Sequence, residues 1–112
     1  MAKPLHVGIS RLNRAIVDYS LARLEFTIAH PDAPEPPLLQ RVGGFTESRP
    51  LASWADTMKR VATLGRYVDD MRAANSSLEG DPIFDRLVRS VRQVGVLAWH
   101  MESMHRRTGG GA

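Results

Sequence analysis

The stretch ISRLNRAIVDYSLARLEFTIA, residues 9–29, decides the fold class of this 112-residue chain. Its apolar residues recur at intervals of three and four, which is the period of an amphipathic helix. They form two neighbouring stripes: Ile9, Leu12, Ile16 and Tyr19 in the first, and Val17, Leu21, Leu24 and Ile28 in the second. Because only a narrow polar strip remains, the pattern predicts the central helix of a bundle, buried from two sides.

A short strand is the alternative reading at the end of this stretch. Leu24, Phe26 and Ile28 alternate with polar residues, as in a half-buried strand. Helix is preferred because the helical spacing continues backward through Leu21 and Val17, and no hairpin turn signal follows.

A proline-rich connector follows the first predicted helix. Residues 31–37, PDAPEPP, cannot form regular helix or a central strand because proline lacks an amide donor, so they predict a stiff, extended segment. Their two overlapping P-x-x-P spacings also occur in proline-motif ligands, although a plain linker is preferred. Residues 38–45, LLQRVGGF, are too apolar for a free loop and are predicted to lie across the helices and seal one end of the core.

Two further helices are predicted from their start signals. Ser48 is a cap candidate and Pro50 stands in the first turn of a helix expected from about Leu51 to Ala74. Asp81 is likewise a cap candidate, and Pro82 stands in the first turn of a third helix that is expected to run to about Met101.

The predicted fold is all-α, a small antiparallel bundle of three long helices with a Pro-rich connector. Residues 1–107 are expected to form a single domain, because two cores would leave each half too small to be stable. The tail, residues 108–112, is expected to be disordered.

Composition restricts the functional classes. The chain has no cysteine, which excludes disulfide scaffolds, Cys-ligated zinc and thiol nucleophiles. No secretory signal or membrane-spanning run is visible, so a cytoplasmic protein is expected. The net charge of +3 favours anionic partners only mildly. The basic residues are mostly arginine, which suits phosphate binding but is also what a GC-rich genome encodes.

The third predicted helix carries a basic ridge. At 100° per residue, five side chains point in nearly one direction and Arg92 flanks them. These ridge residues, predicted to contact a nucleic-acid backbone, are Arg86, Arg89, Arg92, Gln93, His100 and Arg107. The alternative is a solvated outer face without a ligand.

Apolar residues outside the predicted core suggest a protein interface. Val96 interrupts the basic ridge and Trp99 lies at the edge of the apolar stripe, although Trp99 could instead cover the core. The full set predicted for this interface is Val96, Trp99, Leu38, Leu39 and Phe45.

No catalytic, cofactor or metal site is predicted, and the chain is not expected to be an enzyme. His100 and His105 are about 140° apart around a helix, whereas a helical pair of zinc ligands needs i, i+4 spacing. Arg23 falls inside the apolar arc of the first helix, where it could pair with Asp69 or Asp70 or extend its head to solvent.

The expected function is a non-catalytic small basic subunit of a larger nucleoprotein assembly, binding RNA or single-stranded DNA without sequence specificity and contacting neighbouring protein subunits. Helices near twenty residues long argue against a helix-turn-helix reader. In size, charge and helical content the chain resembles the small helical subunits of CRISPR effector complexes and basic accessory bundles of reverse-transcriptase systems, an analogy of class. The alternative is a protein-only interaction module, such as a phage structural component, inhibitor or chaperone, with self-association possible.

Overall fold

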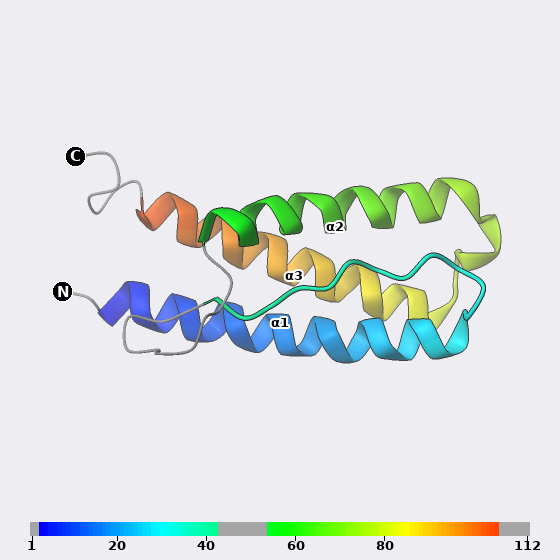
Figure 1. The fold of residues 1–112 in the computed structure, drawn as a ribbon, viewed down its shortest axis with the longest axis horizontal. Coiled ribbons are helices and arrows are strands. Elements are labelled where there is room, and N and C mark those ends of the chain that lie inside the picture. Colours follow the sequence, from blue (N-terminus) through cyan, green and yellow to red (C-terminus); the bar gives the residue numbers. More distant parts are fainter. Residues whose placement is uncertain (1–2, 43–53, 106–112) are drawn as a thin grey trace.

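The computed structural model describes residues 3–42 and 54–105. They form three long helices, α1 (Lys3–Ala29), α2 (Trp54–Ala74) and α3 (Pro82–His105), with a short 3-10 turn, η1 (Ser76–Leu78), before α3. In Figure 1, α3 runs antiparallel to both α1 and α2. The predicted all-α bundle of three long helices is confirmed, and residues 24–28 are helix rather than strand.

α1 begins at Lys3, earlier than the predicted Ile9. Pro4 is compatible with this start, because an amide in the first helical turn has no intrahelical partner to lose. Gly8 weakens the sequence signal, since glycine costs about 1 kcal/mol relative to alanine inside a helix. In the fold it permits close packing: an added Cβ would lie 2.1 Å from Sδ of Met101 on α3.

The other helix ends follow the prediction more closely. α2 ends at Ala74 as predicted, whereas its predicted start near Leu51, with Ser48 and Pro50, lies outside the described residues. α3 starts at Pro82 and continues past the predicted end to His105.

Asp81 caps α3 and joins it to the end of α1. Its Oδ1 accepts a hydrogen bond from the Ile83 amide at 2.9 Å, which confirms the predicted cap. Its Oδ2 lies 2.8 Å from Nε2 of His30, the residue after α1. The Ile83 amide, and with it the His30 side chain, lowers the pKa of the Asp81 carboxyl.

We expect Asp81→Ala to lower the free energy of unfolding by about 1 kcal/mol at neutral pH, the usual loss for a helix cap. Because the pKa of Asp81 is lower in the folded state, its charge stabilises the fold above the unfolded-state pKa of about 4 and this contribution is lost as pH falls through the folded-state value. Urea unfolding at several pH values checks this.

Asp81→Asn is the matched control for the charge, since asparagine also caps helices. It should keep most of the stability at neutral pH but lose less than the wild type between pH 5 and pH 2. Identical acid sensitivity in the wild type and both variants would contradict this role of Asp81.

α3 is the central helix, because α1 and α2 both pack along it. The buried residues on α3 are Phe84, Leu87, Val88, Val91, Val94, Ala98 and Met101; those on α1 are Leu12, Ala15, Ile16, Tyr19, Ala22 and Phe26; those on α2 include Leu64, Val68 and Met71. The prediction that the first helix is central was wrong. Among the described residues, α1 and α2 do not pack extensively on each other, so no second helix covers the outer side of α1.

The connector, residues 30–42, runs back along the bundle between α1 and α2 (Figure 1). It therefore takes the position of a fourth element, with Pro36, Leu39 and Val42 buried. This corrects the prediction that residues 38–45 seal one end of the core: residues 38–42 lie lengthwise along the helices, and Phe45 lies outside the described residues.

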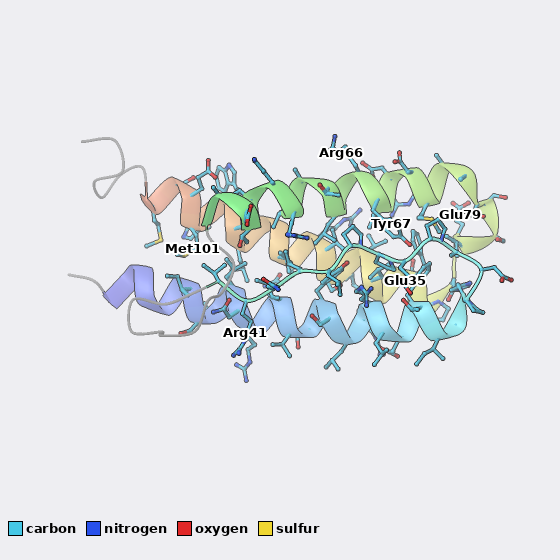
Figure 2. All side chains as sticks on the ribbon, viewed as in Figure 1. Glu35, Arg41, Arg66, Tyr67, Glu79 and Met101 are labelled. Carbon is cyan, nitrogen blue, oxygen red and sulfur yellow. The ribbon has the colours of Figure 1, made fainter. Side chains whose placement is uncertain are left out.

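Side chains of α1 and α2 hold the connector by its backbone carbonyls. The Tyr19 hydroxyl donates to the Pro37 carbonyl at 2.6 Å, and the Tyr67 hydroxyl donates to the Pro34 carbonyl. Figure 2 shows Tyr67 of α2 directed toward the connector. Burial raises the pKa of both tyrosines, which keeps them protonated as donors. Because prolines supply carbonyl acceptors without amide donors, donors from neighbouring helices suit this segment.

Arg23 binds the connector rather than α2 or solvent. Its Nε donates to the Pro36 carbonyl at 2.8 Å, and its Nη2 lies 3.3 Å from the Glu35 carboxylate. The sequence left two alternatives open, pairing with Asp69 or Asp70 and extension of the head group to solvent, and neither is the observed arrangement. The connector approaches the apolar arc of α1 more closely than α2 does, and its carbonyl satisfies the partly buried guanidinium.

Candidate protein-interaction surface

The side of α1 opposite the core carries a row of exposed aliphatic side chains, here called the outer stripe. Its members are Val17, Leu21, Leu24 and Ile28, with exposed fractions of 47%, 58%, 53% and 72%. At 100° per residue, the mean direction of the outer stripe is about 180° from that of the buried residues of α1. Four large apolar side chains thus share one solvent-facing seam.

The outer stripe is the second stripe seen in the sequence, and the prediction that it is buried was wrong. Hydrophobic periodicity shows which residues share a face but not what covers that face. The first stripe does pack into the core, since Leu12, Ile16 and Tyr19 are almost fully buried. The second stripe remains exposed because α3 and the connector occupy the other sides of α1.

Two shallow grooves border the outer stripe. The groove between α1 and α3 is lined by Ala15, Asp18, Leu21, Ala22, Glu25, Arg86, Arg89, Ser90 and Gln93. The groove between α1 and the connector is lined by Ile16, Val17, Ser20, Leu21, Leu24, Leu39, Gln40 and Arg41. Figure 2 shows Arg41 beside α1. The first border therefore mixes both charge signs, whereas Arg41 is the charged group among the described residues that line the second.

The predicted basic ridge is exposed on α3 but is not purely basic in its surroundings. Arg86, Arg89 and Gln93 line the α1–α3 groove together with Asp18 and Glu25. Nη1 of Arg86 lies 2.7 Å from Oε1 of Glu25. These two carboxylates would repel a phosphate backbone laid in the groove.

The remaining ridge residues lie outside this groove. Arg92 and His100 are exposed on α3, and Arg107 lies outside the described residues. The neighbouring carboxylates on α1 come from a different helix, so the sequence position of the ridge gave no indication of them.

The predicted interface residues are divided by the fold. Val96 and Trp99 on α3 are 63% and 67% exposed, so Trp99 does not cover the core, and Leu38 is 63% exposed. Leu39 is buried in the core cluster and offers a partner little surface, because the buried connector residues Pro36, Leu39 and Val42 recur at every third position, the period of a polyproline II segment. Phe45 lies outside the described residues.

Comparisons with protein-family models, with curated proteins and with solved structures found no match. No helix within residues 3–42 and 54–105 combines the length and apolarity needed to cross a membrane. Those ranges also contain no cluster of three or more histidine, aspartate or glutamate side chains arranged to hold a metal ion. The functional proposal therefore depends on the geometry of the surface itself.

Proposed function

We propose that this chain is a non-catalytic protein-interaction module that binds a partner protein through the outer stripe of α1. The observation that carries the proposal is the contiguous exposure of the four aliphatic side chains at Val17, Leu21, Leu24 and Ile28. Full burial of such a side chain contributes about 1.5–3 kcal/mol, so covering four half-exposed ones supplies several kcal/mol toward association. Exposed apolar seams rimmed by polar residues are typical of binding surfaces.

The spacing of the outer stripe favours a helical partner. Its members follow one another at intervals of four, three and four, which is the seam of a coiled coil or of a helix docked on another helix. The charged and polar groups along both borders match the polar rim that surrounds the apolar centre of a protein interface.

The double variant Leu21→Glu/Leu24→Glu tests the proposal. When the tagged chain is chemically crosslinked inside the producing cell before lysis, we expect the wild type to be recovered in a complex and the variant as the free chain, 12.4 kDa plus its tag, because two buried carboxylates have no partner in an apolar seam. Native size-exclusion chromatography with detection of the tag provides the readout.

Val96→Glu/Trp99→Glu is the matched control, since it places the same two charges at exposed apolar positions of another helix. This control should migrate with the wild type. A complex that survives the α1 variant and dissolves in the α3 variant would move the binding surface to α3 and overturn the proposal.

A second candidate is the nucleoprotein subunit, favoured by the exposure of Arg89 and Arg92, which form no ion pair within the described residues. In that case Arg89→Ala/Arg92→Ala should weaken binding to RNA and single-stranded DNA of any sequence. Each lost phosphate contact should also reduce, by about one unit, the slope of the logarithm of the binding constant against the logarithm of the salt concentration. Salt-independent or absent binding by the wild type removes this candidate.

A further inference from the structure

We infer that the partner covering the outer stripe is a second copy of this chain, with the two α1 helices packed antiparallel. The inference rests on the proposed function and specifies its partner. It draws on two observations, the order of side chains along the stripe and the charges on its borders.

The outer stripe is self-complementary about a two-fold axis that passes between Leu21 and Leu24. Antiparallel pairing about that axis places Leu21 against Leu24 of the second copy, and Val17 against Ile28 of the second copy. The leucines meet leucines at the centre and the β-branched residues meet each other at the two ends. Each of the four facing pairs, here called layers, therefore joins an apolar side chain of one copy to an apolar side chain of the other.

The charges in the two grooves that border the outer stripe are also compatible with a second copy. The α1–α3 border holds two carboxylates, Asp18 and Glu25, and two guanidinium groups, Arg86 and Arg89. The proposed register brings Asp18 toward Glu25 of the copy, and the compensating positive charge comes from Arg86, which already lies 2.7 Å from Glu25 of its own chain, and from Arg89. A purely anionic or purely cationic partner would leave half of these groups opposed by like charge.

The border between α1 and the connector adds little charge repulsion between the two copies. Ser20 lines it, and Thr27 lies two helical turns further along the same side of α1. Antiparallel pairing brings these uncharged residues toward each other across the two-fold axis. It also opposes the two helix dipoles, which parallel pairing would align.

The size of the stripe sets the expected strength of the dimer. From Val17 to Ile28 the helix rises about 16 Å, which makes a small interface centred on four layers. We expect a dissociation constant in the micromolar range, about 1–100 μM. The chain would then be a monomer at low concentration and a dimer at high concentration.

Sedimentation equilibrium of the purified chain tests dimerisation. We expect the wild type and Val96→Glu/Trp99→Glu to shift from monomer to dimer over the same concentrations. Leu21→Glu/Leu24→Glu should raise the dissociation constant by at least about 100-fold, because it places like charges opposite each other in the seam. Wild-type protein that stays monomeric at millimolar concentration overturns the inference.

Thermal melting at concentrations below the dissociation constant separates the interface from the monomer core, since dimer formation itself raises stability. There the α1 double variant should melt with the wild type. A large drop in its melting temperature would mean that the stripe is covered within its own chain, which also overturns the inference.

Single-cysteine variants test the antiparallel register, because the chain contains no other cysteine. Under mild oxidation, Val17→Cys mixed with Ile28→Cys should form a disulfide-linked dimer. Val17→Cys alone should not, since its two thiols would be about 16 Å apart along the helices. Efficient linking of Val17→Cys to itself indicates a parallel pair and overturns the register.

The two proposals fail differently in these experiments. If the purified wild type is monomeric while the complex crosslinked in the producing cell is lost in Leu21→Glu/Leu24→Glu, a different protein covers the stripe. The inference is then overturned and the proposed function stands. If neither effect is seen, both fail.

Discussion

Phe26→Ala is expected to lower the free energy of unfolding by about 3–5 kcal/mol. Phe26 is fully buried on α1, and its ring lies 6.0 Å from that of Phe84 on α3 and 4.8 Å from that of His30. Removing it leaves a cavity where α1 joins the start of α3, which neighbouring side chains cannot fill without moving the helices. A chain of 112 residues typically has about 6–17 kcal/mol of stability, so the expected loss is a large share of the total.

Urea unfolding followed by circular dichroism measures this effect. Leu24→Ala is the matched control, because it lies on the same helix but belongs to the exposed outer stripe. Measured below the dissociation constant of any dimer, it should cost less than about 1 kcal/mol. Equal losses in the two variants would contradict the assignment of one face of α1 to the core and the other to solvent.

Asn13→Ala has the second largest expected effect, about 2–3 kcal/mol, because Asn13 holds the connector by two hydrogen bonds. Its Nδ2 donates to the Val42 carbonyl at 3.0 Å, and its Oδ1 accepts from the Val42 amide at 2.7 Å. Val42 is buried, so the variant leaves both of its backbone groups without these partners.

Hydrogen exchange at the Val42 amide, together with urea unfolding, checks the role of Asn13. Exchange at Val42 should become faster in Asn13→Ala. Ser20→Ala is the control, since within the described residues the Ser20 hydroxyl donates to the Ile16 carbonyl of its own helix and not to the connector. Unchanged protection of Val42 in Asn13→Ala would show that the apolar contacts of Leu39 and Val42 alone hold the connector.

Most of the fold could be predicted from local signals in the sequence. The Asp81-Pro82 start of α3 and the proline block after α1 depend on neighbouring residues only, and both are as predicted. The extension of α1 to Lys3 was missed because Gly8 looks unfavourable in isolation, and its value depends on Met101 of a distant helix. The path of the connector depends on donors at Tyr19 and Tyr67, which only the assembled fold brings together.

The candidate site was visible in the sequence but was interpreted as core. Leu21 and Leu24 have the same periodicity whether a second helix or solvent faces them, so the pattern alone does not distinguish the two. The distinction depends on which helix is central, which is a property of the tertiary arrangement. The basic ridge could likewise be found on α3, whereas the carboxylate of Glu25 beside Arg86 became apparent only when α1 was placed next to it.

The most direct test of the outer stripe as a binding surface is photo-crosslinking inside the producing cell. A benzoylphenylalanine residue at Ser20 borders the stripe without removing any of its side chains. The same residue at Thr63, exposed on α2, is the control. We expect irradiation to join the Ser20 variant covalently to one protein, with a mass of twice the 12.4 kDa chain for a second copy, and to leave the Thr63 variant unlinked. An unlinked Ser20 variant, or equal linking from both positions, would contradict the assignment of the outer stripe as the binding surface.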